Sequence, residues 1–148
     1  YTATNSDGFN ANALRSIYVY KTGNFTSSIE GLYKSTVVRN NAASAQYTDM
    51  KYVIVWKNTN GTYEVSDAIG GYYEYGRSYG VGYASRGLTF NYTSGTSATV
   101  ASQASGVGAF GGALVTTAAT IDAAAKTIKF TSDWDAGYAF VVTLTQVN

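Results

Sequence analysis

The segment with the clearest chemical potential runs from Gly70 to Tyr83 and reads GGYYEYGRSYGVGY. Five tyrosines and five glycines lie in it, together with one glutamate and one arginine. Tyrosine offers a flat apolar face and a polar hydroxyl, and glycine lets another surface approach the backbone closely. Tyrosine, with a reference pKa of about 10, is a poor acid or base at neutral pH. The segment therefore favours recognition of a sugar ring, a peptide or a partner protein over catalysis.

If this segment is a binding loop, its rings are stacking platforms and its charged side chains are polar anchors. The candidate ligand-binding residues are Tyr72, Glu74, Tyr75, Arg77 and Tyr79, with Tyr73 and Tyr83 as further platforms. The alternative is a scaffold, in which glycines form bulges and tight turns while alternate tyrosines pack inward. We expect a split, with Tyr75, Arg77 and Tyr79 the most exposed, because Gly76 and Gly80 bracket them as a projecting turn.

The chain contains no cysteine and no histidine. Thiol nucleophiles, the serine–histidine triad, disulfides and the usual zinc and iron ligands are therefore excluded. Asp133 and Asp135 form a carboxylate pair, but a calcium site needs about six to eight oxygens, and a glycosidase pair flanks a cleft. We interpret both as acids of a hairpin turn. We expect no catalytic residue, no metal site and no cofactor, and hence no enzyme.

Charge and hydropathy exclude two further classes of partner. Ten basic and nine acidic residues give a formal charge of +1 without a basic stripe, so nucleic-acid binding has little electrostatic support. No apolar run approaches the roughly 18 residues of a membrane span.

The apolar residues alternate with a period of two, which indicates strands rather than helices. Such alternation occurs in Tyr52–Trp56, Leu88–Tyr92, Ile128–Trp134 and Tyr138–Leu144, and Asn58–Gly61 is a turn between two strands. We predict an all-β fold, either an antiparallel β-sandwich or a barrel-like meander. The chain has no proline to blunt an edge strand, so closure or covered edges are expected.

Other large aromatic side chains lie outside the glycine–tyrosine segment. Trp56 and Trp134 are in phase with apolar neighbours on their strands, so we expect both in the core. The stretch Thr93–Gly112 is almost entirely small residues. It is either a mobile loop that carries Phe110 at the mouth of a site or a connection without a role.

The first residues differ from the rest. Tyr1–Phe9 has the pattern of a strand end and turn, Arg15–Lys21 predicts one more strand, and Gly23–Ser28 is a polar linker. This start resembles the last two strands of an immunoglobulin-like domain found in Bacteroidetes surface lipoproteins. We predict that residues 1–28 are the remnant of such a domain plus a linker, and that residues 29–148 form one all-β ligand-binding domain.

The main domain resembles the C-terminal domain of SusE-like outer-membrane lipoproteins of Bacteroidetes. The resemblance rests on Ile29–Lys34, on Tyr63–Asp67 leading into the glycine–tyrosine segment, and on Ile121–Phe130. Such lipoproteins are encoded with SusC/SusD-type nutrient importers and lie on the extracellular face of the outer membrane. The resemblance implies membrane attachment through a lipid anchor only, and the lipidated cysteine is absent from these residues.

The expected function is non-catalytic binding of glycan or peptide for a SusC/SusD-like importer. A second possibility is a structural accessory module that packs on the importer by its tyrosine-rich face and binds no small ligand. A third is a glycoside hydrolase whose carboxylate pair the sequence does not reveal.

Overall fold

The structure is a computed structural model that describes residues 2–4, 6–12, 17–40 and 42–147. Its strands are β1 (Thr2–Thr4), β2 (Asn10–Asn12), β3 (Gly31–Arg39), β4 (Tyr47–Lys57), β5 (Tyr63–Val65), β6 (Leu88–Asn91), β7 (Ser97–Ser102), β8 (Leu114–Thr116), β9 (Ala119–Asp122), β10 (Thr127–Trp134) and β11 (Tyr138–Gln146). Three short helical turns lie between strands: η1 (Tyr72–Gly76), η2 (Val81–Tyr83) and η3 (Gly108–Phe110). None of the described helical turns is long or apolar enough to cross a membrane.

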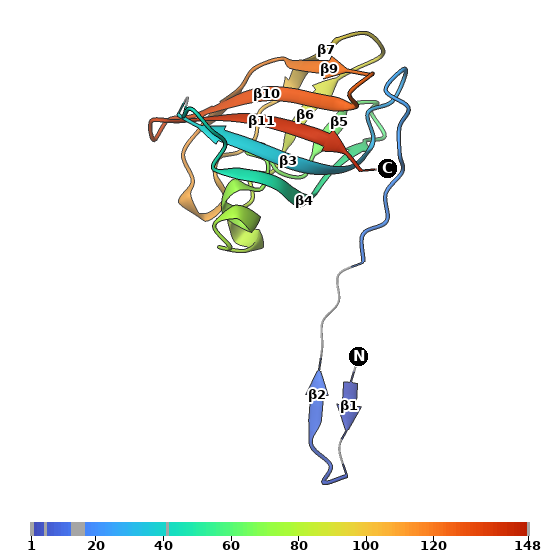
Figure 1. Cartoon of the computed structure of the whole chain (residues 1–148), viewed down its shortest axis with the longest axis vertical. Helices are drawn as coiled ribbons and strands as arrows, with labels where there is room; N and C mark the ends of the chain where they lie inside the picture. Colours follow the sequence, from blue (N-terminus) through green and yellow to red (C-terminus); the bar gives the residue numbers. More distant parts are fainter. Residues whose placement is uncertain (1, 5, 13–16, 41, 148) are drawn as a thin grey trace.

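Eight of the described strands close into an antiparallel barrel, which confirms the predicted all-β fold. The order around the barrel is β3, β4, β5, β6, β7, β9, β10 and β11, so each strand pairs with its neighbours along the chain apart from β8. Strand β11 closes the ring because it pairs with β10 on one side and with β3 on the other (Figure 1).

The short strand β8 is not one of the eight strands of the ring. It pairs with β10 along the same edge as β9, and its other edge is covered. It pairs with the last residues of β10, whereas β9 pairs with the first ones. Gln103 supplies the missing partner: its side-chain carbonyl accepts from the Thr116 backbone N–H at 2.7 Å, and its amide donates to the Thr116 carbonyl at 3.1 Å. One side chain thereby replaces a strand at this edge, as expected for a sheet without proline.

The predicted alternation places the core correctly in most strands. Phe140, Val142 and Leu144 of β11 are fully buried, as are Leu88 and Phe90 of β6. The prediction for Trp56 is wrong: it is 36% exposed, and its indole N–H donates to the Asn58 side chain at 3.0 Å. Strand β4 turns the opposite face inward because the small side chains Val53 and Val55 fill the interior.

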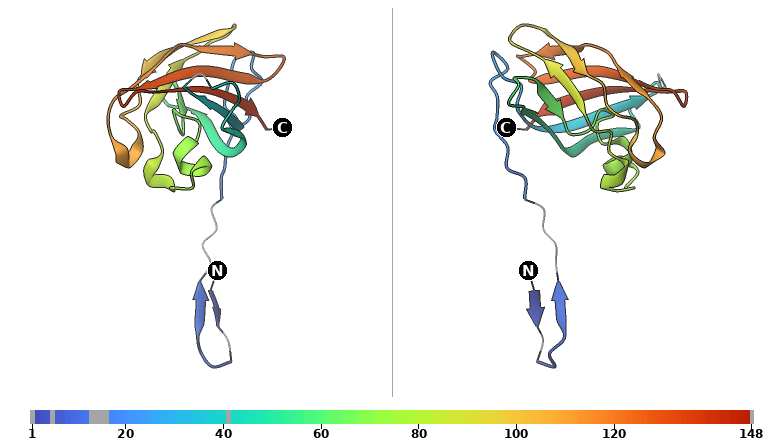
Figure 2. Two further views of the ribbon diagram at one scale, coloured as in Figure 1. Left: turned by 60° about the vertical axis from the view of Figure 1, so that its left-hand side comes forward. Right: turned by 180° about the vertical axis from the view of Figure 1, so that it is seen from behind.

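The N-terminal hairpin of β1 and β2 lies apart from the barrel, and residues 17–24 before the barrel form no helix or strand (Figures 1 and 2). The strand predicted at Arg15–Lys21 is absent from residues 17–20, and residues 13–16 lie outside the described residues. The immunoglobulin-like character of residues 1–28 stays a prediction.

The last part of the predicted linker packs on the barrel. Phe25 is 1% exposed, and its carbonyl accepts from the Tyr92 hydroxyl at 2.8 Å. The backbone N–H of Gly23 donates to the Glu30 carbonyl at 2.7 Å. Phe25 therefore adds to the core although it precedes the first strand of the barrel.

We expect Phe25→Ala to lower the free energy of unfolding by about 3–5 kcal/mol, the usual cost of truncating a large buried side chain. Val19→Ala is the matched control, because Val19 belongs to the same segment and is 92% exposed. Its effect should stay within about 0.5 kcal/mol. Urea unfolding of both variants tests this. If Phe25→Ala changes the free energy of unfolding as little as Val19→Ala does, residues 23–28 do not support the barrel.

Candidate functional site

The glycine–tyrosine segment enters the barrel at one end and is anchored there by Tyr72. The Tyr72 ring is 2% exposed, and its centre lies 5.2 Å from that of Phe140 and 4.9 Å from that of Tyr47. Just before it, Gly70 adopts a φ of +66°, and a Cβ there would come within 2.4 Å of the Ser35 hydroxyl. Only glycine allows the backbone to lie this close to the barrel wall.

The turn η1 then directs the next tyrosine towards the barrel end. Its hydrogen bonds run five residues along the chain, from the Gly76 N–H to the Gly71 carbonyl at 3.0 Å and from the Arg77 N–H to the Tyr72 carbonyl at 2.9 Å. This is the wide turn of a π-helix. Such turns are rare in proteins, and those that occur often lie at functional sites. Tyr73 follows Tyr72 into the interior and is 7% exposed.

Around Tyr73, aromatic rings from four segments gather at one end of the barrel. We call this set the aromatic end; it consists of Tyr73, Tyr79, Tyr83, Phe110, Trp134 and Tyr138. The Tyr73 ring stacks on Tyr79 with centres 5.9 Å apart and planes 15° apart. The Phe110 ring lies 5.1 Å from that of Tyr73, and Trp134 stacks with Tyr138 at 5.7 Å.

The aromatic end is partly open to solvent. Tyr79 is 46% exposed and Phe110 is 48% exposed, whereas Tyr83, Trp134 and Tyr138 are half-buried beneath and beside them. Figure 2 shows the segment of η1 and η2 and the loop of η3 side by side at this end of the barrel. Exposed rings supported by buried ones make a surface whose shape exists before a ligand arrives.

The loop that carries Phe110 is the stretch of small residues singled out in the sequence. A Cβ on Gly108 would lie 2.4 Å from the Tyr83 Cα, so the two loops meet backbone to backbone. The indole N–H of Trp134 donates to the Gly111 carbonyl at 3.1 Å, and the Asp135 carboxylate accepts from the Ala113 N–H at 2.9 Å. Part of Thr93–Gly112 is strand β7, which differs from both possibilities, and the remainder places Phe110 in the aromatic end; its role at the mouth of a site stays a prediction.

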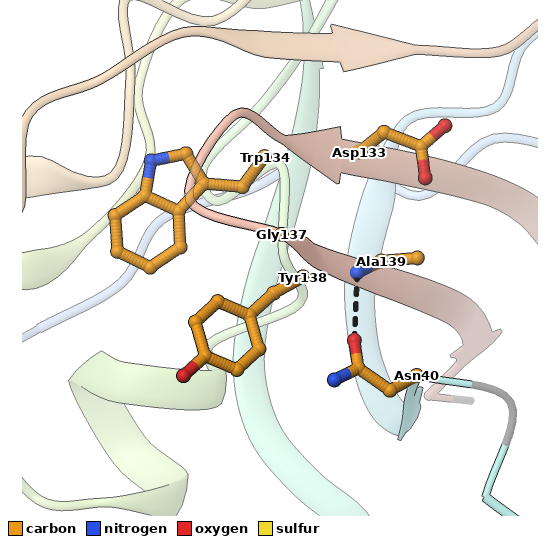
Figure 3. A pocket seen from close by; sticks show the side chains of 6 residues that line it. All are labelled: Asn40, Asp133, Trp134, Gly137, Tyr138 and Ala139. Carbon is orange, nitrogen blue, oxygen red and sulfur yellow. Dashed lines mark hydrogen bonds between the residues drawn. The ribbon is translucent and has the colours of Figure 1, made fainter.

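An open pocket of about 390 Å³ adjoins the aromatic end at the hairpin of β10 and β11. It is lined by Asn40, Asp133, Trp134, Gly137, Tyr138 and Ala139 (Figure 3). The Asn40 side-chain carbonyl accepts from the Ala139 N–H at 3.0 Å, which fixes the floor of the pocket. The Trp134 and Tyr138 rings point together to one side, and the Asp133 carboxylate points away from them (Figure 3).

The five predicted ligand-binding residues fall in three different places. Arg77 and Tyr79 are exposed, with Tyr79 in the aromatic end. Tyr72 and Glu74 are buried, so the Tyr72 ring supports the surface from within. Tyr75 is half-buried rather than projecting, because its ring packs against that of Tyr52 at 6.1 Å.

Sequence reasoning missed the contribution of β10 and β11. The sequence predicts Trp134 in the core, and in the structure Trp134 packs on core residues but also lines the pocket. Tyr138 and Asn40 carried no signal of their own, because each is one residue in an ordinary strand or turn. Only the closure of the barrel brings them beside the glycine–tyrosine segment.

The acidic residues near the aromatic end make local contacts with the loops beside it. No group of three or more potential metal ligands occurs within the described ranges. The Asp135 carboxylate, in the turn between β10 and β11, accepts from the Ala113 N–H and so anchors the end of the η3 loop. Glu74 pairs with Arg86 at 3.6 Å, and the Arg86 guanidinium also donates to the Ser66 carbonyl.

Comparison with known proteins places this barrel in a family. The model of a family described as a "-like, C-terminal domain" matches residues 22–146. The chain belongs to this family of C-terminal domains. Two solved chains match, and one is the crystal structure of the lipoprotein BT2262 from Bacteroides thetaiotaomicron, with a TM-score of 0.68. The identity is 26%, over 99% of this chain and 72% of that one. No curated protein matches.

A buried carboxyl group lies just before the glycine–tyrosine segment and accepts a hydrogen bond from the backbone there. Asp67 is fully buried, and its side chain accepts from the Ile69 N–H at 2.9 Å, so it caps the turn before Gly70. Burial raises the pKa of Asp67 from 3.8 to about 7, and the charge of Glu74 adds to this effect. The folded state therefore favours the neutral carboxyl group.

This raised pKa predicts that stability falls as the pH rises. The neutral form contributes fully below the unfolded-state pKa near 3.8, and its contribution is lost as the pH rises through about 7. No histidine titrates in this range. We expect the free energy of unfolding to fall between pH 5 and 7 by up to about 1.4 kcal/mol per pH unit. Asp67→Asn should flatten this dependence in urea unfolding.

The control for this prediction is Asp133→Asn, because Asp133 is exposed on the outer side of β10. The control should keep the pH dependence of the wild-type chain. An Asp67→Asn variant that also keeps it would show that Asp67 is charged in the folded state at these pH values.

Proposed function

We propose that this chain is a non-catalytic binding domain of a bacterial surface lipoprotein and that it holds glycan chains at its aromatic end. The observation that carries the proposal is that the rings of Tyr79 and Phe110 are exposed and pack against buried and half-buried aromatic rings. Sugar rings present apolar C–H faces that stack on exposed aromatic side chains, and hydroxyls that hydrogen-bond to polar groups beside them.

The polar groups of the adjoining pocket support the same ligand class. The side-chain amide of Asn40 offers N–H donors on the same side of the pocket as Tyr138, and the Asp133 carboxylate lies on the opposite side. The surface is open and its aromatic rings lie side by side, which suits a chain of sugar rings with apolar C–H faces better than a peptide that needs separate pockets for its side chains. A surface of this size binds weakly at each site.

The cellular setting of the proposal rests on the relatives. BT2262 is a lipoprotein of Bacteroides thetaiotaomicron. By analogy, the protein that contains this domain is anchored by lipid on the outer membrane and faces outward. There it captures glycan for a SusC/SusD-like importer, in line with the SusE-like resemblance.

A structural accessory module is the second candidate function. Val81 of η2, which lies between Tyr79 and Tyr83 in the chain, is 71% exposed, so apolar surface extends beyond the aromatic rings. Contiguous exposed apolar surface marks protein interfaces as well as ligand sites. In this alternative the same end of the barrel packs on the importer and binds no glycan.

The two functions differ in what Tyr79→Ala and Phe110→Ala do to glycan binding. If the aromatic end binds glycan, each variant should weaken binding by about 1–3 kcal/mol, the usual cost of losing an aromatic contact. Screening on a glycan array followed by calorimetry measures this. Thermal melts should show both variants folded, because both side chains are about half exposed.

Trp56→Ala is the matched control. Trp56 is 36% exposed, but it lies on the barrel wall and belongs to no ring contact of the aromatic end. It should bind glycan as the wild-type chain does. Equal losses in all three variants, or no glycan bound by the wild-type chain, would favour the structural module.

A further inference from the structure

Two guanidinium groups border the aromatic end. The first is Arg39, the last residue of β3, which is half-buried. Its guanidinium carbon lies 4.8 Å from the ring centre of Tyr138 and 5.2 Å from that of Tyr72. A guanidinium that lies over aromatic rings keeps N–H donors available at its edge.

The second group is Arg77, which follows η1 and is exposed to solvent. Its guanidinium carbon lies 5.9 Å from the ring centre of Tyr79. Hydrogen bonding to Tyr79 and then to Tyr47 raises the pKa of Arg77. Because Tyr47 also packs on Tyr72, both cations border the same group of rings.

Neither arginine has a carboxylate partner in the part of the chain that the structure describes. The ion pairs there join Lys21 to Glu30 and Arg86 to Glu74. The nearby acids are otherwise engaged or turned away. Asp135 accepts from the Ala113 N–H, and Asp133 points away from the rings (Figure 3). Both guanidinium groups are therefore available to pair with an acidic ligand, while the carboxylates of Asp133 and Asp135 at the same end keep their own charge.

We propose that the aromatic end selects acidic glycans, whose carboxylates pair with Arg39 and Arg77 while their sugar rings stack on the exposed aromatic side chains. The proposal rests on the proposed function, since it assigns a substrate class to that same surface. Arginine is suited to this task because its planar group donates two parallel hydrogen bonds to one carboxylate. A neutral glycan would leave both cations without a partner.

The test compares acidic oligosaccharides with the same oligosaccharides after chemical reduction of their carboxylates to alcohols. Oligomers of galacturonate, alginate and hyaluronan, each in both forms, are titrated into the whole chain by calorimetry. We expect at least one acidic form to bind the wild-type chain about tenfold or more tighter than its reduced form, since hydrogen bonds to charged groups are the stronger ones. Added salt should weaken the binding of the acidic form.

Variants assign this preference to the two arginines. Arg39→Gln and Arg77→Gln should each lower the preference, measured as the ratio of the dissociation constants of the reduced and the acidic form. Arg77 is exposed, so Arg77→Gln keeps the test valid if Arg39→Gln weakens the fold. The matched control is Lys57→Gln, because Lys57 is also a cation over a tyrosine ring, 5.4 Å from the centre of Tyr63, but lies outside the aromatic end.

The outcomes separate this inference from the proposed function. Binding of reduced or other neutral glycans at the aromatic end, as tight as that of the acidic forms, would overturn the inference and leave the proposed function intact. If no glycan of either kind binds the wild-type chain, both fail. If oligoglutamate binds as tightly as the acidic glycans and with the same dependence on both arginines, the site recognises polyanions in general and the inference is overturned.

Discussion

The burial of two consecutive tyrosines at the end of the barrel is the constraint on which the rest of the site depends. In a strand, Tyr72 and Tyr73 would point to opposite faces. The π-helical turn instead lets both rings pack on Phe140, at 5.2 and 6.1 Å. Tyr72 then supports Arg39, and Tyr73 supports Tyr79 and Phe110. The exposed rings are held in place because the rings beneath them are part of the core.

The barrel itself could be predicted from the sequence because each strand carries its own signal. The alternation in β6, β10 and β11 follows the inward and outward faces of a closed sheet. Alternation alone does not distinguish a β-sandwich from a β-barrel, because both have one inward and one outward face. Trp56 shows the limit of this reasoning. Period-two alternation states which residues share a face but not which face is inside, and the smaller valines occupy the interior of β4.

The site could be predicted only in part, because it is assembled from segments far apart in the sequence. The glycine–tyrosine segment was recognisable from its composition, and Tyr79 and Arg77 are exposed as expected. A π-helical turn has no sequence pattern comparable to the period of a strand, so the burial of Glu74 and the packing of Tyr75 on Tyr52 were not foreseen. Arg39, Asn40 and Tyr138 reach the site only through the pairing of β11 with β3.

Ligand binding at the aromatic end is the central claim, and the fluorescence of Trp134 tests it most directly. The chain has two tryptophans. Trp56→Phe leaves Trp134 as the only indole, and Trp134→Phe leaves Trp56. Titration with the acidic and neutral oligosaccharides should change the emission of the Trp56→Phe variant and leave that of the Trp134→Phe variant unchanged. Calorimetric binding to the Trp56→Phe variant without any change in Trp134 emission would place the ligand elsewhere and contradict the account.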